Sequence, residues 1–405
     1  MSKALLISMI GQGRPKKEGQ SSYDLIDYQF QDGEVISTTV FGIALYKYLR
    51  RKGEDIDLLL VGTKGSSWTE LVVEENLLEE FEELIKLLEE KERERNVEEN
   101  LLKEFVKLIE KSLNAEVKYV LLNSPPSPEE ISQKTIGVLV DLFEEKNYNK
   151  VYIDITHGFR YMPTVVLLNL MILKKLWNFD IEIYYGFGIF DTGRSEGPKK
   201  VARLNHLEDL IKLSEALSIL ENTGDFRHYY KLVSDNQEAQ QIYFRIETNA
   251  QINNSNIREL INTPVNSEYV KPIHEKVRSK YLEPLKADRM EDRLKNRARF
   301  FFERGQYLKA VLLLHEALIL LVGKLKNMIG GSCLEYRQRE ETKRYLDQLD
   351  YYEWRVLKHL RNACAHGTQP HVEARHAWEN EEKFKEVMEK GFEFYEKIKN
   401  GKIEV

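Results

Sequence analysis

The feature that most constrains the fold of this chain is a change in the kind of segment along it. Up to about residue 206, short β-branched and aliphatic runs alternate with segments of helical periodicity. Such alternation is typical of a mainly parallel sheet covered by helices on both faces. After His206 the strand-like runs nearly stop and helical patterns dominate. The sequence therefore predicts an α/β, Rossmann-like domain followed by an all-α region.

The predicted elements follow from these patterns. Strands are expected at 3–9, 56–61, 116–122, 150–155 and 180–187, and helices near 36–51, 69–112, 128–146 and 162–177. The charged stretch 74–111 has apolar residues at helical spacing. Mixed charge is usually a solvated helix surface, so this stretch is interpreted as a helical insertion packed on the sheet rather than a binding arm.

Helix-breaking residues divide the second half of the chain. Single long helices are interrupted by the polar run 251–256 and by three prolines, Pro264, Pro272 and Pro284. We therefore expect an α/β domain over 1–206, a helical connector over 207–290 and a helical domain over 291–405.

Composition excludes several classes of protein. The 405 residues are 42% hydrophobic and 31% charged, and no apolar run is long enough to span a membrane. Only Cys333 and Cys364 occur, so neither a disulfide scaffold nor a zinc ribbon is expected, and a cytoplasmic location fits. The net charge of -6 argues against a general nucleic-acid coat, but a local basic patch could still bind RNA.

Glycine-bearing loops follow four of the five expected strands. Ligands of open parallel sheets bind outside the carboxyl ends of strands, and glycine, threonine, histidine and arginine can donate hydrogen bonds to phosphate oxygens. The candidate ligand residues are Gly11, Gln12, Gly62, Thr63, Thr156, His157, Gly158 and Arg160, with a further loop at 186–188. Ordinary tight turns would explain any one loop, but four together favour an anionic, phosphate-bearing ligand.

The same loops argue against two common nucleotide sites. A dinucleotide fingerprint needs a third glycine where Lys16 stands, and no ribose-binding acid follows the second expected strand. A phosphate loop of the Gly-x-x-x-x-Gly-Lys-Ser/Thr type is also missing from the sequence. A nicotinamide cofactor and a P-loop ATPase are therefore not expected.

An Arg-x-x-x-x-His pattern lies in a helix predicted from about residue 350 to His366. Gly367 and Pro370 follow, which ends the helix and places His366 in its last turn, where the helix dipole favours the protonated imidazole. Arg361 and His366 lie about 140° apart around the helix and about 7.5 Å apart along it. A single helix is therefore poorly suited to bring both side chains to one phosphate.

Two such helices, related by the twofold axis of a homodimer, could bring both pairs to one cleft. The small residues Ala363, Cys364 and Ala365 would permit that approach. There a histidine can assist attack by the ribose 2′-hydroxyl or protonate the leaving oxygen, while an arginine holds the developing charge. This route needs RNA and no metal. An exposed arginine followed by a helix-ending histidine is the plainer interpretation of the pattern alone.

Nearby basic residues could line an RNA groove, although a solvated helix face has the same composition. They are Arg293, Lys295, Arg297, Arg299, Arg304, Arg355 and Lys358. No metal site is expected. His359 and His366 are two turns apart, and His366, His371 and His376 are spaced by five residues rather than by the three or four of chelating pairs.

Two motifs together resemble a known family. Asp154-Ile155-Thr156-His157-Gly158-Phe159-Arg160, followed by Pro163, and the later Arg361-Asn362-x-x-x-His366 resemble CRISPR-associated type III ribonucleases of CARF plus HEPN architecture. The first motif is similar to the subfamily named for a Thermotoga protein. The resemblance covers nearly the whole chain.

The resemblance implies a fold and a function. The CARF sensor domain over 1–206 would bind cyclic oligoadenylate as activator, with no other cofactor, and the HEPN domain over 291–405 would then cleave single-stranded RNA nonspecifically in antiviral defence. It implies a homodimer with one ligand at the twofold axis. By position it assigns Arg361 and His366 to the catalytic pair and Asn362 to the polar residue frequent after that arginine, and it places the eight loop residues in the ligand pocket.

Two other functions compete with this interpretation. A non-catalytic nucleotide-sensing regulator could bind DNA or a protein partner, but no clear helix-turn-helix is seen in 207–405. A Rossmann-type small-molecule enzyme is less favoured, because the loops offer no arrangement for hydride or acyl transfer.

Overall fold

In this computed structural model, the described residues are 3–13, 25–72, 80–187, 197–234, 237–248, 250, 254–330 and 335–405. The chain divides into two compact units, Met1–Ile211 and Lys212–Val405. Several residues of the sequence analysis lie outside the described ranges, namely Lys16, the first residues of the 74–111 insertion, Gly188, part of the 251–256 run and Cys333.

The N-terminal unit contains an eight-stranded, mainly parallel sheet with strand order β3-β2-β8-β7-β6-β1-β4-β5. The strands are β1 (Lys3–Met9), β2 (Ile26–Gln29), β3 (Val35–Thr38), β4 (Ile56–Thr63), β5 (Val117–Leu122), β6 (Tyr148–Asp154), β7 (Asp180–Gly186) and β8 (Lys199–Arg203). From β7 to β5 across the centre, neighbouring strands are parallel; β8 runs antiparallel to β7 and β3 antiparallel to β2.

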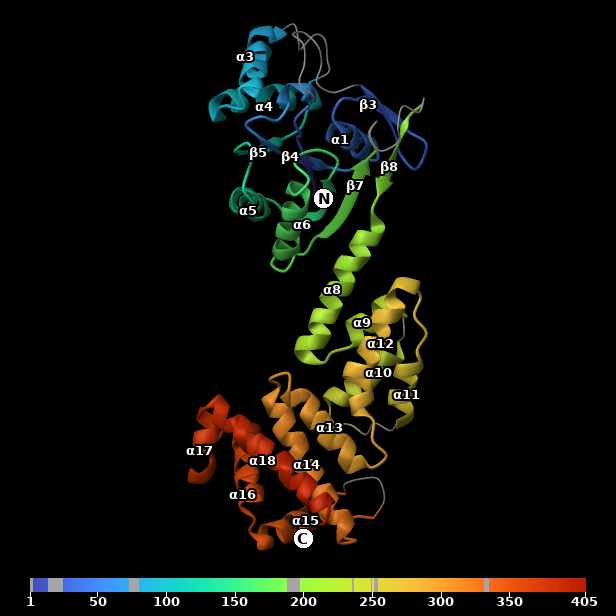
Figure 1. The fold of residues 1–405 in the computed structure, drawn as a ribbon, viewed down its shortest axis with the longest axis vertical. Helices are drawn as coiled ribbons and strands as arrows, with labels where there is room; N and C mark the ends of the chain where they lie inside the picture. The colour runs from blue at the N-terminus through green and yellow to red at the C-terminus, as the bar shows by residue number, and fades with distance from the viewer. Residues whose placement is uncertain are drawn as a thin grey trace. The chain divides into compact units, whose positions relative to one another are not determined.

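Helices cover both faces of this sheet (Figure 1). They are α1 (Phe41–Arg51), the 3-10 turn η1 (Trp68–Leu71), α3 (Glu82–Arg93), α4 (Glu99–Leu113), α5 (Pro128–Glu145) and α6 (Met162–Leu173). In β1, Ala4 and Leu6 face the core formed with α1, α3 and α4, whereas Leu5 and Ile7 face the core formed with α5 and α6. Because alternate residues of a strand point to opposite faces, central strands buried on both faces need continuous apolar runs.

The predicted doubly wound sheet is confirmed, and its five predicted strands correspond to β1, β4, β5, β6 and β7. Three strands were missed. β2 and β3 form a short hairpin, so the helix predicted from residue 36 begins only at Phe41. β8 has the polar sequence Lys-Lys-Val-Ala-Arg and owes its strand conformation to pairing with β7. These three strands lie together at one edge of the sheet. Strands there are less buried than the central ones, so their sequences contain fewer apolar residues.

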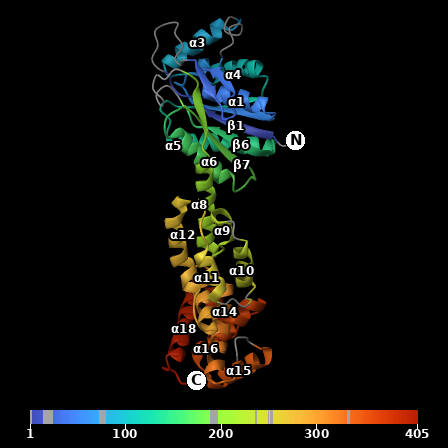
Figure 2. The same ribbon diagram turned by 90° about the vertical axis from the view of Figure 1, so that its right-hand side faces the viewer.

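The C-terminal unit is helical, as predicted. Its elements are α8 (Asn205–Thr223), which begins in the first unit, α9 (Arg227–Val233), α10 (Glu238–Glu247), α11 (Asn254–Asn262), η2 (Glu268–Val270), α12 (Lys271–Val277), η3 (Arg278–Leu282), η4 (Glu283–Leu285), α13 (Met290–Phe302), α14 (Tyr307–Leu325), α15 (Tyr336–Leu349), α16 (Tyr352–His366), α17 (Val372–Glu379) and α18 (Glu381–Lys399). Both α16 and α18 pack on α14 (Figure 2).

One hydrophobic core runs through the C-terminal unit. It extends along the chain from Leu213 to Ile398 and includes most of α14, whose residues Ala317 to Leu320 are fully buried. The segments 207–290 and 291–405, predicted as connector and helical domain, contribute to this same core. Their separation into two domains stays a prediction. Among the described residues, no helix has the length and apolar character needed to cross a bilayer.

Candidate ligand and nuclease sites

The carboxyl ends of the central strands form the first candidate site. β1 lies between β6 and β4, and the chain passes from one side of β1 to the other when it returns from β5 to β6. β1 is therefore a switch point, where open α/β sheets bind ligands. Gly11 and Gln12 follow β1 and the segment 156–160 follows β6, so the fold brings these two groups of predicted residues to adjacent strand ends.

A buried carboxyl group fixes the loop after β6. Asp154 has no exposed surface and accepts hydrogen bonds from the Ser8 hydroxyl and the Thr156 N–H, both at 2.8 Å. The Thr156 hydroxyl in turn accepts the Gly186 N–H from the end of β7 at 2.8 Å. Burial raises the pKa of Asp154, against the effect of these bonds, because it disfavours the charged form. Asp154 and Thr156 together thus tie the ends of β1, β6 and β7 to one another.

His157 lies beside the first turn of α1. Its Nε2 accepts the N–H of Phe41 at 3.3 Å, so this nitrogen carries no proton. Burial lowers the pKa of His157, and the nearby Asp154 carboxyl only partly opposes the shift. His157 is therefore a neutral imidazole that holds the loop against α1 and offers no positive charge to a phosphate.

The rest of this loop turns outward. Gly158 has φ of 90°, in the left-handed region that favours glycine, and a Cβ there would lie 3.2 Å from the Cβ of Met9. Two residues later, Arg160 is exposed and forms no ion pair with any residue that the structure describes. Pro163 lies in the first turn of α6, where its fixed φ favours the start of a helix. The loop thus presents Arg160 as an exposed cation at the switch point.

On the β4 side the predicted residues shape the loop rather than line its surface. A Cβ on Gly62 would lie 2.5 Å from the ring of Trp68, which is fully buried. The Trp68 Nε1–H donates to the Thr63 carbonyl oxygen at 2.9 Å. Thr63 is itself fully buried, with its hydroxyl 3.1 Å from that of Ser66. Contact between a ligand and Gly62 or Thr63 stays a prediction.

The β1 loop is fixed in the same way. The Gly11 carbonyl oxygen accepts the Ser67 N–H at 2.9 Å, and the Gly13 N–H donates to the Ser67 hydroxyl at 2.9 Å. Gln12 is exposed and donates from Nε2 to the Ser124 hydroxyl, after β5, at 3.1 Å. Gly11 is therefore part of the scaffold, whereas Gln12 lies at the surface of the strand ends.

Arg95, which the sequence analysis did not select, lies at this same edge. It has φ of 55° in the turn between α3 and α4, and the nearby Val97 N–H donates to the Lys64 carbonyl oxygen at 3.1 Å. A Cβ on Gly65 would lie 2.5 Å from Gln12 Nε2 and 2.9 Å from Arg95 Cγ. The charged insertion thus reaches the strand ends, which no local pattern in its sequence indicates.

The second candidate site surrounds Arg361 in α16. Its guanidinium donates to the Asn362 side-chain oxygen at 3.1 Å and lies 3.9 Å from the carboxylate of Glu316 in α14. Arg339 of α15 binds the same carboxylate through two hydrogen bonds of 2.8 and 2.5 Å. Burial opposes ionisation of Glu316, but hydrogen bonds from His315 and Arg339 outweigh it and lower the Glu316 pKa to about 2.

Glu316 and Arg339 were missed by the sequence analysis. For Glu316 a signal was available, because it is a charged residue within the otherwise apolar run of α14. Arg339 is one of many charged residues in α15 and had none. Glu316, which Arg339 fixes in place, holds Arg361 close to the core of the unit.

His366 is the last residue of α16, as predicted. Gly367 follows with φ of 64°, and its N–H donates to the Ala363 carbonyl oxygen at 2.8 Å, which closes the helix in the left-handed form typical of glycine. The His366 side chain is exposed and has no hydrogen-bond or ion-pair partner within the described ranges of the chain. Arg361 and His366 therefore share a helix, but their surroundings differ.

Two expectations about this region are corrected. Ala363 is buried in the core and Cys364 packs against it, so of the three small residues only Ala365 is exposed to an approaching helix. Arg297, expected in an RNA groove, is buried; it donates to the Ile246 carbonyl oxygen at 2.6 Å, and burial lowers its pKa to about 10.

The other basic residues predicted to line that groove also bind acceptors of this chain. Their partners are backbone carbonyl oxygens for Arg293 and Arg304, and carboxylates for Lys295, Arg299, Arg355 and Lys358. Helical periodicity alone could not show these partners, because the acceptors lie on other elements or on the preceding turn.

Comparison with known proteins links the first site to a family. Residues 5–187 match the family model of the CRISPR system endoribonuclease Csx1, CARF domain. No curated protein matches the chain. Among solved structures, Enterococcus italicus Csm6 bound to cyclic hexa-2'-fluoro-hexa-dAMP aligns with a TM-score of 0.39 and 12% identity, over 98% of this chain and 93% of that one. The N-terminal unit, with its sheet and strand-end loops, is thus similar to the CARF domain of Csx1.

Proposed function

We propose that this protein is a cyclic-oligoadenylate-activated, metal-independent endoribonuclease that cleaves single-stranded RNA in type III CRISPR antiviral defence. The observation that carries the proposal is the loop Asp154–Arg160 at the switch point of a sheet that matches the Csx1 CARF domain. This loop is held by buried hydrogen bonds and presents Arg160, which has no ion-pair partner among the described residues. The finer subfamily suggested by the Asp-Ile-Thr-His-Gly-Phe-Arg motif is part of the proposal.

The strand-end site suits a phosphate-bearing ligand. Arg160 supplies a cation whose planar guanidinium can bind phosphate through two parallel hydrogen bonds. Gln12 adds an exposed amide on the neighbouring strand end, and Arg95 adds a second guanidinium across the β4 loop. Because the Asp154 network fixes the loop, ligand binding costs little ordering of the backbone.

A second copy of the chain is part of the proposal. Helix α6, which follows Arg160, has apolar side chains at exposed positions four residues apart: Leu168 is 53% exposed, Ile172 58% and, just past the helix, Leu176 73%. Such a stripe is costly to leave in water and fits an isologous contact with the same stripe of a second copy. A ligand at the twofold axis would then meet Arg160 from both chains.

The C-terminal unit supplies the proposed chemistry. With Asn362 and Glu316 orienting it, Arg361 stabilises the charge that develops on the phosphoryl oxygens. His366 transfers a proton as the 2′-hydroxyl attacks the phosphate and the 5′-oxygen leaves. The products are a 2′,3′-cyclic phosphate and a free 5′-hydroxyl. His366 is exposed and Arg361 is anchored inward, so we place the complete site where two copies of α16 meet.

Labelled RNA and a panel of cyclic oligoadenylates test this function directly. With a chelator present, cleavage should rise strongly when the matching activator is added and should yield 2′,3′-cyclic phosphate ends. A 2′-deoxy substrate should stay intact, because it lacks the attacking hydroxyl. Activator binding without cleavage would instead support a non-catalytic regulator, and cleavage that needs a divalent metal would refute the mechanism.

The dimer has its own test. Ile172→Lys places a charge in the centre of the α6 stripe and should convert a dimer into a monomer in sedimentation velocity, with loss of activated cleavage. Leu87→Lys is the matched control, because Leu87 is a similarly exposed apolar residue on α3. An unchanged sedimentation coefficient in Ile172→Lys would remove α6 from the interface.

A further inference from the structure

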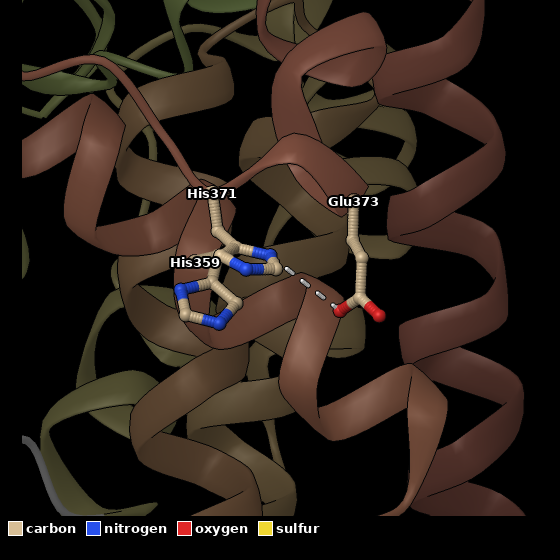
Figure 3. Close-up of side chains that lie close together, drawn as sticks. All are labelled: His359, His371 and Glu373. Carbon is tan, nitrogen blue, oxygen red and sulfur yellow. Dashed lines mark ion pairs between the residues drawn. The ribbon is translucent and has the colours of Figure 1, made fainter.

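Three side chains that commonly bind metals lie together where α16 meets α17. His359 projects from α16, His371 precedes α17 and Glu373 lies in its first turn (Figure 3). Each offers one ligand atom, and these atoms all lie within 4.8 Å of one another. The two histidines are twelve positions apart in the sequence, which is why no chelating spacing revealed them.

The surrounding structure holds this group in place. The two imidazole rings stack with their centroids 4.9 Å apart and an angle of 23° between their planes. Arg355, one turn before His359 on α16, binds both oxygens of Glu373 at 2.8 and 2.9 Å. Metal-binding carboxylates are typically fixed by such an outer hydrogen-bond partner. The turn that joins His366 to α17 therefore ends beside three donors that the surrounding structure keeps close together.

The chemistry of the donors indicates the class of ion. Two imidazole nitrogens and one carboxylate oxygen suit Zn²⁺ or a similar borderline divalent ion, with a fourth position left for water. Ligand atoms of tetrahedral zinc lie about 3.3 Å apart, so the widest pair here must close by about 1.5 Å. His371 is exposed and at the start of a helix, so rotation of its side chain can supply that movement.

We propose that His359, His371 and Glu373 bind one zinc-class divalent cation, which clips the start of α17 to α16. The ion would hold His371, the residue that follows the segment 367–370, against α16, the helix that ends at His366. It would not touch the reacting phosphate, so it is a structural clip and leaves the proposed metal-independent cleavage in place. The binding itself rests on the geometry of the three side chains and stands apart from the proposed function.

Titration of the full, metal-stripped chain tests the clip. Isothermal titration with Zn²⁺ should show one ion per chain, and Co²⁺ should give the visible absorption bands of a tetrahedral site. At saturating Zn²⁺ the midpoint of thermal unfolding should rise by about 5 °C or more. Absence of both binding and the rise in midpoint would overturn the proposal.

Variants locate the ion. His359→Gln and His371→Gln should each weaken Zn²⁺ affinity by about tenfold or more and remove the rise in unfolding temperature. His376→Gln, an exposed histidine of α17 outside the group, and His366→Gln should bind Zn²⁺ like wild type. If Zn²⁺ binding survives His371→Gln but is lost in His366→Gln, the ion sits at the proposed catalytic histidine and the clip is wrong. Since His371 is exposed, its variant keeps the test valid even if His359→Gln folds poorly.

Discussion

The two candidate sites differ in how complete each of them is within a single chain. At the strand ends of the N-terminal unit, Asp154, Thr156 and His157 all bind partners within the unit, so the loop is formed before any ligand arrives. In the C-terminal unit, Arg361 is anchored beside Glu316, whereas His366 is exposed at the end of its helix, without a hydrogen-bond or ion-pair partner in the part of the chain that the structure describes. Under the proposed function, a loop formed in advance would suit activator sensing, and a catalytic site that one chain leaves incomplete would suit a switchable nuclease.

The pKa values of buried carboxyl groups also differ between the two sites. Burial dominates at Asp154 and raises its pKa, because the partners there are neutral hydroxyl and amide groups and a neutral imidazole. At Glu316 two cationic or basic partners outweigh burial, and the pKa falls to about 2. The first site thus builds its scaffold from neutral groups, and the second from paired charges.

The largest expected effect concerns the half-built site. His366→Ala and Arg361→Ala should each lower activated RNA cleavage by about 10²- to 10⁴-fold, the range typical of losing a general acid or a charge-stabilising donor. His366→Ala should leave thermal unfolding unchanged because the His366 side chain is exposed. Arg361→Ala should lower stability slightly. His376→Ala is the control. Cleavage by His366→Ala at the wild-type rate would break the comparison between the sites.

The next effect concerns the preformed loop. Arg160→Ala removes one charge-assisted contact and should raise the activator concentration for half-maximal cleavage by about 10- to 100-fold, with the maximal rate kept. Arg51→Ala, at the opposite end of α1, is the control. An unchanged activator concentration for half-maximal cleavage, together with a lower maximal rate, would assign this loop to catalysis rather than to sensing.

Two glycine substitutions test how rigid the strand-end scaffold is. Gly62→Ala drives a methyl group into the buried ring of Trp68 and should lower the free energy of unfolding by about 1–3 kcal/mol. Gly137→Ala, in α5, meets no atom within 4 Å and should raise it by about 0.5–1 kcal/mol, because alanine favours the helix. Chemical denaturation measures both. Equal stability of the two variants would mean that the loop accommodates the added methyl group at little cost in free energy.

The last effect is a pH dependence of opposite sign in the two units. Burial raises the pKa of Glu92, which accepts hydrogen bonds from Thr69, to about 8. Its folded pKa is above the ordinary 4.5, so its contribution to stability is lost as pH rises from 4.5 to about 8. Glu316, with a pKa of about 2, contributes stability that is lost as pH falls from 4.5 to about 2.

Thermal unfolding across pH should separate these two carboxyls. Relative to wild type, Glu92→Gln should gain stability as pH rises towards 8, since the amide cannot ionise. Glu316→Gln should lose stability above pH 4.5, and the loss should shrink as pH approaches 2. Parallel pH curves for Glu92→Gln and wild type would show that Glu92 stays ionised and exposed.

Local patterns were enough to predict much of this protein. The central strands were found because burial on both faces demands unbroken apolar runs, as in β1 and β4. The end of α16 was found because Gly367 can adopt the left-handed conformation that closes a helix. The position of the Asp154–Arg160 loop followed from the rule that parallel strands gather their carboxyl ends at one edge.

Only the tertiary structure decided which polar groups are available. The sequence patterns indicated Thr63 as a ligand contact and Arg297 as an RNA contact. The fold buries both side chains, and each has a hydrogen-bond partner within the chain. Arg95 and the stacked pair His359 and His371 are candidate functional residues only because the fold places them beside residues that are distant in sequence. Periodicity describes what one element prefers, whereas a site depends on distances between elements, which packing alone determines.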